Sequence, residues 1–450
     1  MLPREYIEEI ENCLKVEAKD FLESFNDKPQ RGLRVNTLKG SVKGFLDKNP
    51  WKISDDDSIS WCECGFYIKD DDELPDGIVP YGKHPFHNAG VYYMQEPSAM
   101  APVTELLIKP KDRVLDLCAA PGGKSTQIAS LLEGSGILFS NEPNLGRAKI
   151  LAENIERCGI KNAVVISHDP DEIKDKFAGY FNKILVDAPC SGEGMFRKNN
   201  DAILEWSMDN VYNCQKRQKQ IVDAAINMLS DGGRMVYSTC TFSNAEDEDI
   251  VSYILEKYPF MTLIKMEKLL PHKIKGEGHF LAVFEKTGKE QISELYDVTN
   301  VSSFEEGKKL KSFKELKEFL DESINGELED IFNAEYTYLC FGQEVYALPK
   351  GCPSLRGLKV LRSGLHLGTL KKNRFEPSFA LAIALDKKSV KNNMEASFEE
   401  AIDYLKGQSL SYDGNKGWYL INYQGYSLGW GKLSNNTMKN HYPKGLRILC

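Results

Sequence analysis

The feature that most constrains the fold of this chain is an alternation of strand-like and helix-like segments between residues 91 and 286. Short runs rich in Val, Ile and Leu alternate with segments whose apolar residues recur at helical spacing. This alternation is typical of an α/β fold, in which helices cover both faces of a parallel sheet. The predicted strands are 113–119, 136–142, 163–169, 183–189 and 234–240, and the predicted helices are 124–132, 145–159 and 222–229.

The first predicted strand leads into a glycine-rich turn, DLCAAPGGKST at residues 116–126. Ligands of parallel sheets bind at the carboxyl ends of the strands. Glycines there let a ligand approach the backbone closely, and the following helix offers free N–H groups at its N-terminus. The candidate ligand-binding residues are therefore Cys118, Ala119, Ala120, Pro121, Gly122, Gly123 and Lys124.

Two ligands suit this turn. The first is a nucleotide phosphate, because GGKS and the strand ILVD (184–187) imitate parts of a P-loop ATPase, although the first P-loop glycine would fall on Cys118. The second is S-adenosylmethionine, whose amino-acid end can lie over a glycine turn. Glu142, after the second strand, could then bind the ribose hydroxyls, and Asp169, after the third strand, could accept a hydrogen bond from the adenine amino group.

Each of the last two predicted strands ends beside a cysteine, in DAPCSGEG (187–194) and YSTCT (237–241). A thiolate can add to carbon 6 of a pyrimidine and so activate carbon 5 for methylation. That chemistry also needs an acid near ring nitrogen 3, a place that Asp187 could occupy. Cys190, Cys240 and Asp187 are therefore candidate catalytic residues.

The remaining cysteines and the apolar runs exclude several classes of protein. The chain has 11 cysteines, an odd number that does not favour a disulfide framework. No apolar run approaches the ~20 residues of a membrane helix, and the start of the chain does not resemble a signal peptide. Cys62 and Cys64 have no second pair at zinc spacing, so no metal site is predicted. We expect a cytoplasmic protein without a membrane partner, and a monomer by default.

The charge is distributed unevenly along the chain. Residues 336–450 carry a net charge of +8, and the rest of the chain carries −17. This asymmetry indicates a nucleic-acid-binding region attached to an acidic catalytic body, although a basic end can also be ordinary solvated surface. The expected divisions are an N-terminal α+β domain at 1–90, a catalytic domain at 91–286, a linker and helical connector at 287–335, an intermediate domain at 336–396 and a terminal domain at 397–450.

In combination, DLCAAPGGK, DAPCSG and YSTCT resemble the Nop/Sun family of RNA cytosine-5 methyltransferases. RVNTLK (34–39) and QEPSAM (95–100) match the upstream motifs of that family. The segments 269–284, 361–382 and 428–447 are similar to its bacterial 16S ribosomal RNA (cytosine-5) methyltransferase F subgroup. The resemblance therefore extends over nearly the whole chain.

The resemblance implies a Rossmann-like, S-adenosylmethionine-dependent methyltransferase core, with the N-terminal domain before it and a PUA-like RNA-binding domain at 397–450. It makes Cys240 the nucleophile and Cys190 the residue that lets the methylated RNA leave. It implies cofactor contacts by residues 118–124, Glu142, Asp169 and Asp187. The implied partner is RNA, most simply 16S ribosomal RNA or the small ribosomal subunit, and the target base must leave its stack to reach the cysteine.

Further residues are implied for RNA or active-site support. The candidates are Arg34, Asn36, Gln95 and Lys198. In the basic region, cations could neutralise phosphates and aromatic rings could stack on unpaired bases, although Trp418 and Trp430 fit a buried core better. The cations are Lys371, Lys372, Arg374, Lys439, Lys444 and Arg447, and the aromatic residues among them are Phe375, Trp430 and Tyr442.

Four alternatives remain open at this stage: a transfer RNA methyltransferase, a P-loop ATPase, a catalytically dead RNA-binding factor, and a DNA cytosine-5 methyltransferase. The last would use Cys190 as its nucleophile. The presence of both cysteines and of Asp187 counts against a dead enzyme, and the PUA-like end favours RNA over DNA.

Overall fold

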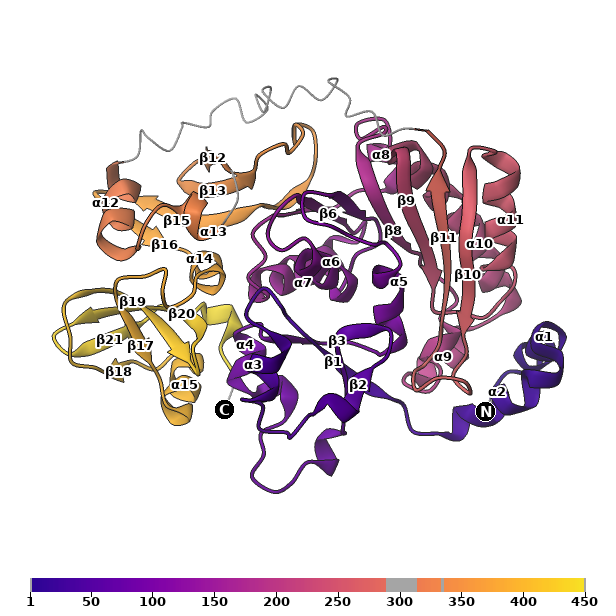
Figure 1. Ribbon diagram of the computed structural model, residues 1–450, viewed down its shortest axis with the longest axis horizontal. Helices are drawn as coiled ribbons and strands as arrows, with labels where there is room; N and C mark the ends of the chain where they lie inside the picture. Colours follow the sequence, from indigo (N-terminus) through magenta and orange to yellow (C-terminus); the bar gives the residue numbers. More distant parts are fainter. Residues whose placement is uncertain (1, 289–313, 333–335, 449–450) are drawn as a thin grey trace.

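A computed structural model describes residues 2–288, 314–332 and 336–448. Figure 1 shows a central sheet with a smaller N-terminal sheet beside it and two further sheets formed by the C-terminal part of the chain. Within the predicted linker and helical connector at 287–335, residues 289–313 and 333–335 lie outside the described residues. None of the described helices is both long and apolar enough to cross a membrane.

The central sheet has eight strands in the order β10-β11-β9-β8-β5-β6-β7-β14. Five of them are parallel and correspond to the five predicted strands: β5 (Arg113–Asp116), β6 (Ile137–Asn141), β7 (Ala163–Ile166), β8 (Phe181–Asp187) and β9 (Leu229–Thr239). The first of them, β5, lies between β6 and β8, so the strand order reverses at β5. Ligands of such sheets bind outside the carboxyl ends at the point of reversal.

The prediction of a parallel sheet needs one correction, because both edges carry antiparallel strands. At one edge β10 (Met261–Leu269) and β11 (His279–Lys286) form a hairpin that pairs with β9. At the other edge β14 (Val360–Ser363) pairs with β7. A hairpin pairs antiparallel because its connection is too short for a crossover. β14 comes from a segment far along the chain and covers an edge that would otherwise expose unpaired backbone groups.

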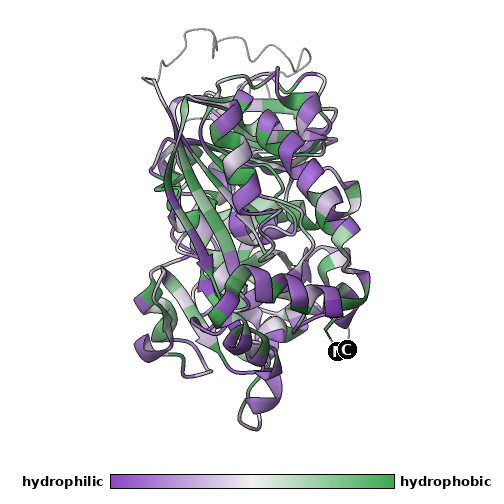
Figure 2. Cartoon of the chain, turned by 90° about the vertical axis from the view of Figure 1, so that its right-hand side faces the viewer, coloured by the Kyte–Doolittle hydropathy of each residue, from purple (hydrophilic) through white to green (hydrophobic). Residues whose placement is uncertain are grey.

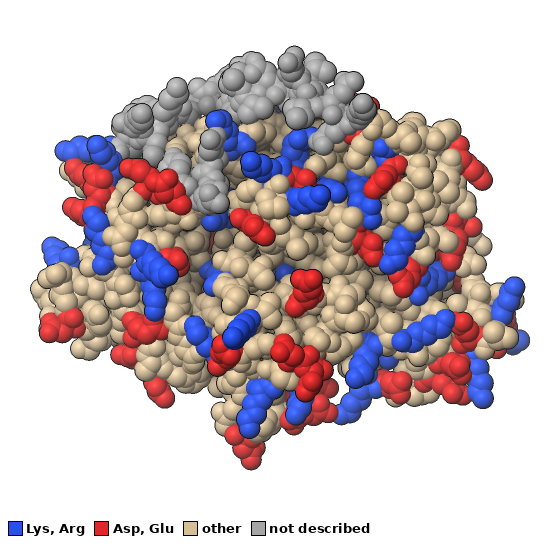
Figure 3. Space-filling model, in the orientation of Figure 1, with Lys and Arg blue, Asp and Glu red and all other residues tan. Residues whose placement is uncertain are grey.

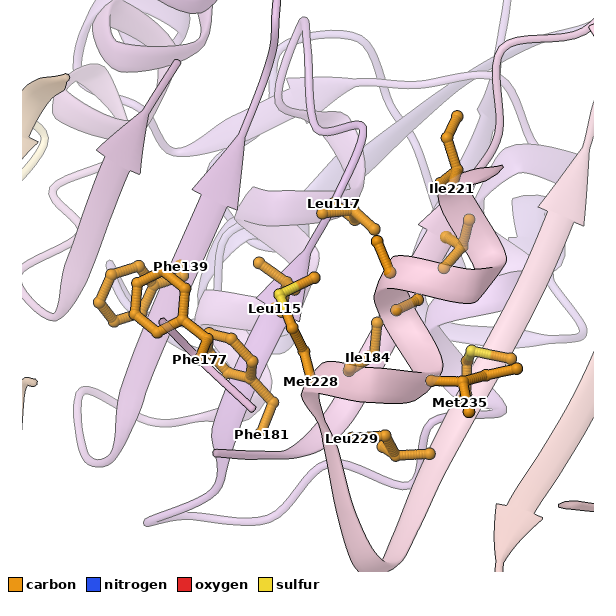
Figure 4. Close-up of a cluster of buried hydrophobic side chains, with 14 of the residues drawn as sticks. Leu115, Leu117, Phe139, Phe177, Phe181, Ile184, Ile221, Met228, Leu229 and Met235 are labelled. Atoms are coloured by element: carbon orange, nitrogen blue, oxygen red, sulfur yellow. The ribbon is translucent and has the colours of Figure 1, made fainter. Parts of the chain in front are cut away.

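Helices cover both faces of this sheet. On one face, α5 (Ala101–Thr104), α6 (Gly123–Leu131) and α7 (Leu145–Arg157) pack with Val114, Leu138 and Leu185. On the other face, α8 (Pro170–Ile173), α10 (Met208–Met228) and α11 (Glu248–Lys257) pack with a cluster that includes Leu115, Phe139 and Met235 (Figure 4). Figure 2 shows the apolar residues gathered along the strands inside this arrangement.

The longest helix, α10, extends well beyond the predicted helix at 222–229. The added part contains VYNCQKRQKQI (211–221), in which polar residues outnumber the buried apolar residues Val211, Cys214 and Ile221. Ser207 caps the start of the helix by accepting a hydrogen bond from Asn210 N. The segment DGG (231–233), which follows α10, lies within β9, with Gly232 in the left-handed region at φ 73°.

The N-terminal segment consists of two helices and a four-stranded sheet. The sheet order is β2-β3-β1-β4, with β1 (Arg31–Val35), β2 (Ser58–Ile59), β3 (Cys62–Ile68) and β4 (Tyr92–Met94). Short helices α3 (Val42–Leu46) and α4 (Pro85–Asn88) lie between these strands in the chain. The helices α1 (Arg4–Leu14) and α2 (Ala18–Glu23) share a buried cluster with Phe196, Trp206 and Phe242. They therefore support the loops that follow β8 and β9, together with the short helix α9 (Asn200–Glu205).

The C-terminal part forms two sheets. The first, in the order β12-β13-β15-β16, is flanked by α12 (Lys314–Ser323), α13 (Leu328–Phe332) and α14 (Phe379–Ala384). The second, in the order β17-β19-β20-β21-β18, is flanked by α15 (Phe398–Leu405). The strand bounds are β12 Tyr336–Phe341, β13 Glu344–Pro349, β15 Leu365–Lys371, β16 Arg374–Pro377, β17 Asn393–Glu395, β18 Leu410–Ser411, β19 Gly417–Tyr423, β20 Tyr426–Ser434 and β21 Thr437–Asn440.

The two ends of the chain share a core. The ring of Phe86 lies 5.6 Å from that of Tyr423 and 5.3 Å from that of Tyr426, and both C-terminal rings belong to a cluster that contains Leu33 and Tyr92. Three strand pairs also cross the expected domain divisions. β4, after residue 90, pairs with β1; β14, in the expected intermediate domain, pairs with β7 of the central sheet; and β17, before residue 397, pairs with β19. Removing the C-terminal sheet would therefore expose apolar surface of the N-terminal segment.

Candidate active site

The glycine-rich loop joins β5 to α6 at the point where the strand order reverses. Gly122 has φ 113°, a conformation that L side chains rarely adopt, and it immediately precedes α6. A Cβ atom at Gly123 would lie 3.3 Å from Tyr93 Cε1 and 3.4 Å from Gln95 Cδ. The close contacts at Gly123 leave little room for a side chain. Because α6 begins here, its first N–H groups lie at the carboxyl edge of the sheet.

A buried carboxylate that the sequence reading did not single out lies beneath this loop. Asp116 accepts a hydrogen bond of 2.6 Å from Ser125 Oγ through Oδ2, and its Oδ1 has no partner. Burial raises the pKa of this carboxyl to about 7, against the opposing effect of the Ser125 hydrogen bond. The signal in the sequence was an acid at the end of an otherwise apolar strand.

The other two predicted acids differ in their surroundings. Glu142 is only 3% exposed, accepts a hydrogen bond of 3.0 Å from Asn144 N, and lies 3.4 Å from Arg147 Nη1. Asp169 is exposed and caps α8 by accepting a hydrogen bond of 3.0 Å from Asp171 N. The structure therefore gives Asp169 a capping role, and its contact with adenine stays a prediction.

Asp187 is the centre of a polar cluster at the end of β8. Its carboxylate lies 2.8 Å from Lys124 Nζ and 3.3 Å from His279 Nε2, and it accepts a hydrogen bond of 2.9 Å from Ser238 Oγ. Burial tends to raise the pKa of Asp187, but Lys124 and His279 outweigh it and hold this pKa well below its ordinary value. Asp187 is therefore ionised in the free protein. The sequence reading missed His279 and Ser238.

The two predicted cysteines meet beside this cluster. Cys190 Sγ and Cys240 Sγ lie 3.2 Å apart, at the ends of the adjacent parallel strands β8 and β9. All ten cysteines among the described residues are free thiols. The contact with the Cys240 sulfur, together with burial, raises the pKa of Cys190 well above its ordinary value. Cys190 therefore keeps its proton near neutral pH.

The residues predicted to support RNA binding fall into two groups. Arg34 is 1% exposed and donates to Gln95 Oε1 at 3.0 Å and Thr126 Oγ1 at 2.6 Å, which ties β1 to α6. Asn36 is also buried and donates to the carbonyl oxygen of Cys158 at 2.8 Å. Of the two predicted roles, burial favours support of the active site over RNA contact for Arg34 and Asn36. By contrast, Lys198 and Gln95 line an open cavity of about 460 Å³.

The aromatic residues predicted to stack on RNA bases are part of the core. Phe375 and Tyr442 are each only 4% exposed, so the prediction of base stacking by these two rings is wrong. Trp430 also donates from Nε1 to the carbonyl oxygen of Ser378. Burial of Trp418 and Trp430 confirms the alternative that both belong to the core. Of the basic residues, Lys371, Lys372, Arg374, Lys439 and Lys444 are exposed, and Arg447 is half-buried.

A parallel sheet with a glycine-rich loop at its strand reversal, acids at the neighbouring strand ends and a cysteine pair beside a carboxylate define a methyltransferase domain. Four family descriptions match consecutive parts of the chain. Residues 103–289 match "16S rRNA methyltransferase RsmB/F", 2–97 the N-terminal domain of RsmF, 318–385 its first C-terminal domain, and 391–448 its PUA domain. The chain belongs to this RsmB/F family of RNA methyltransferases.

Curated relatives agree with this assignment. "Ribosomal RNA small subunit methyltransferase F" of Vibrio vulnificus is 31% identical over 99% of this chain and 97% of its own length. The protein of the same name from Shewanella piezotolerans is 33% identical over 95% of this chain and 93% of its own length. The predictions of the family and of an RNA cytosine-5 methyltransferase are confirmed, and the P-loop ATPase alternative is removed.

Solved structures confirm the fold. A methyltransferase homolog protein from Pyrococcus horikoshii is 26% identical with a TM-score of 0.54, covering 62% of this chain and 93% of that one. NSun6 from Pyrococcus horikoshii with SFG has a TM-score of 0.56 at 24% identity and covers 64% of this chain and 99% of that one. The predicted fold class, a methyltransferase core with an N-terminal domain and a C-terminal PUA domain, is confirmed.

Proposed function

We propose that this protein transfers a methyl group from S-adenosylmethionine to carbon 5 of a cytosine in 16S ribosomal RNA, with Cys240 as a covalent nucleophile. The observation that carries the chemistry is the 3.2 Å contact between Cys190 and Cys240 beside the Asp187 carboxylate. Family membership and the names of the relatives support 16S ribosomal RNA as the substrate. The proposed place of action is the cytoplasm.

The residues around the glycine-rich loop suit S-adenosylmethionine. Gly122 and Gly123 keep the backbone free of Cβ atoms at the start of α6, and Glu142 offers a carboxylate to the ribose hydroxyls from the end of the neighbouring strand. Asp116 provides a buried oxygen without a partner beneath the loop. We assign the contacts to residues 118–124, Glu142, Asp169 and Asp187. When bound, S-adenosylmethionine supplies the methyl group.

The first half of the reaction forms a bond between the protein and the RNA. Cys240 loses its proton to solvent, and its thiolate adds to carbon 6 of the flipped cytosine, which makes carbon 5 nucleophilic toward the methyl group. Negative charge develops at nitrogen 3 of the ring. Since Asp187 is ionised in the free site, the neutralising proton comes from the Lys124 ammonium group 2.8 Å away, through the Asp187 carboxylate.

The second half of the reaction breaks this bond. The proton on carbon 5 passes to Cys190 while the thiol proton of Cys190 passes to the departing Cys240 sulfur, 3.2 Å away. The proton on nitrogen 3 returns to Lys124 as the ring recovers its aromaticity. One proton is therefore released overall, and both cysteines end as thiols. With these roles, Cys240 is necessary for the attack on carbon 6, and Cys190 is necessary for release of the methylated RNA.

Transfer of a tritiated methyl group from S-adenosylmethionine to unmodified 16S, 23S and transfer RNA, and to small ribosomal subunits, tests the proposal. We expect label in 5-methylcytidine from 16S RNA, alone or within the subunit. Label in transfer RNA alone would show that transfer RNA, and not 16S ribosomal RNA, is the substrate. Tight cofactor binding without label in any of these substrates would favour a catalytically dead RNA-binding factor.

We also propose that the C-terminal basic residues bind RNA phosphates. On the face shown in Figure 3, basic and acidic side chains are interspersed, so the charge asymmetry of the sequence does not form one broad basic area there. The adjacent exposed pair Lys371 and Lys372 on the β15–β16 hairpin is the densest basic element of the predicted set.

Removing the charges of Lys371 and Lys372 should weaken RNA binding and make the affinity for RNA less dependent on salt concentration. In the double variant Lys371→Gln/Lys372→Gln, we expect the slope of log affinity against log salt to become less negative by about 1.4, since each phosphate contact to a single strand contributes about 0.7. The matched control is Lys314→Gln/Lys317→Gln on exposed positions of α12. Equal slopes for both variants and the unaltered protein in a filter-binding titration would refute RNA contact by Lys371 and Lys372.

A further inference from the structure

The two loops that carry the cysteines are bonded to each other. The loop after β8 contains Cys190, and the loop after β9 contains Cys240. Gly194 N in the first loop donates to the carbonyl oxygen of Cys240 at 2.7 Å, and the hydroxyl oxygens of Ser191 and Thr241 lie 2.9 Å apart. The positions of the two sulfur atoms therefore depend on contacts between the loops.

A buried acid in the first loop holds the second loop. Glu193, which is 0% exposed, accepts a hydrogen bond of 2.8 Å from Phe242 N and one of 3.0 Å from Trp206 Nε1. Phe242 follows Cys240 by two residues along the chain. The carboxylate of Glu193 thus fixes the backbone just beyond Cys240 and connects it to the aromatic cluster beneath α1 and α2.

A buried acid in the second loop holds the first loop in return. Glu246, also 0% exposed, accepts hydrogen bonds from Ser191 N at 3.1 Å and from Gln218 Nε2 at 2.7 Å. Ser191 follows Cys190 directly. Gln218 Nε2 also donates to the carbonyl oxygen of Pro189 at 3.0 Å, so Glu246 and Gln218 hold the backbone on both sides of Cys190.

These two carboxyl groups are costly to bury. Burial raises the pKa of Glu193 to about 7 and also raises the pKa of Glu246. Well-packed apolar residues often stabilise a core as well as buried charges do, so buried charges are weak evidence for stability. A role in fixing the geometry of the two loops accounts for their presence.

We propose that Glu193 and Glu246 are crossed positioning residues, with Glu193 aligning Cys240 for attack on the cytosine and Glu246 aligning Cys190 for release of the methylated RNA. This inference rests on the proposed covalent route. It predicts that equivalent substitutions of the two acids affect different halves of one reaction, since each acid holds the backbone beside a different cysteine.

The test is to separate attack from release in Glu193→Gln and Glu246→Gln. A glutamine presents an NH₂ group where one carboxylate oxygen accepted a hydrogen bond, so it weakens one contact without removing side-chain volume. We expect Glu193→Gln to slow single-turnover methyl transfer at least about tenfold without accumulating adduct. We expect Glu246→Gln to transfer about one methyl group per enzyme and then slow at least about tenfold, with an SDS-stable protein–RNA adduct accumulating.

Controls separate this inference from the covalent route itself. Glu256→Gln is the matched control, because Glu256 is an exposed glutamate on α11, outside the two loops. Cys190→Ala is run in parallel as the reference for a trapped adduct. Absence of adduct in Cys190→Ala would refute the covalent route, whereas adduct in Cys190→Ala but no difference between Glu193→Gln and Glu246→Gln would overturn only the crossed positioning.

Milder variants keep the test usable if a glutamine variant does not fold. Trp206→Phe removes one donor to Glu193, and Gln218→Met removes one donor to Glu246. We expect Trp206→Phe to slow attack and Gln218→Met to accumulate adduct. If both variants slowed attack alone, or both accumulated adduct, the proposal would be overturned. Thermal unfolding checks that each variant is folded.

Discussion

Cys240→Ala is expected to lower methyl transfer at least about 1000-fold and to leave no covalent adduct with RNA. The structure places the Cys240 sulfur at the carboxyl end of β9, 3.2 Å from Cys190 and in the loop held by Glu193. Since the neighbouring Cys190 keeps its proton near neutral pH, it does not replace the Cys240 thiolate, and the remaining rate would come only from binding the two substrates close together. Single-turnover transfer of a tritiated methyl group measures the loss.

The control for this variant is Cys64→Ala, because Cys64 is a half-buried cysteine on β3 in the N-terminal sheet. Cys64→Ala should keep the full rate, and Cys240→Ala should keep its affinity for S-adenosylmethionine. A Cys240→Ala protein that methylates RNA within tenfold of the unaltered rate would show that Cys240 is not the nucleophile.

Asp187→Asn is expected to lower methyl transfer at least about 100-fold, a typical contribution of a positioned proton-transfer group. The substitution removes the carboxylate that carries a proton from Lys124 toward the ring, and it leaves the largely buried Lys124 ammonium without its counter-charge. The measurement is kcat and KM for RNA. Its control is Asp175→Asn, because Asp175 is exposed just beyond α8.

The pH dependence of this effect follows from the direction of the pKa shift. Lys124 and His279, against the effect of burial, hold the pKa of Asp187 well below its ordinary value. The stabilisation by this ionised group is therefore present above about pH 4, the ordinary value for Asp, and is lost only as the pH falls through the lowered pKa. We expect no step in stability from Asp187 between pH 5 and pH 8, and a smaller loss of stability in acid for Asp187→Asn than for the unaltered protein.

The sequence predicted the parts of the site that lie at the ends of consecutive parallel strands. Cys190 and Cys240 follow adjacent strands, so their proximity could be inferred from the alternation of strands and helices. His279 lies on β11, an antiparallel strand that the alternation does not reveal, and its contact with Asp187 was therefore missed. The bonds of Glu193 and Glu246 were missed because they join two loops, whose conformations follow no periodic pattern.

Charge and aromatic content predicted less than strand order did. The basic C-terminal region and its aromatic residues favoured an RNA surface with stacking rings, but the rings of Phe375 and Tyr442 are buried in packed clusters. The burial of Arg34 could not be predicted from the sequence either, because a strand with one buried arginine has the same alternation of apolar and polar residues as a half-exposed strand. The shared core of the two chain ends, formed by residues such as Phe86 and Tyr423, depends on tertiary packing alone.

The measurement that tests the central claim most directly is the identification of the protein–RNA bond in Cys190→Ala. The variant is incubated with S-adenosylmethionine and the RNA that accepts label, and the SDS-stable adduct is digested with protease and nuclease and analysed by mass spectrometry. We predict one adduct, a methylated cytidine bound to the peptide that contains Cys240, and none in Cys190→Ala/Cys240→Ala. Absence of an adduct while methyl transfer continues, or an adduct at a residue other than Cys240, would contradict the account.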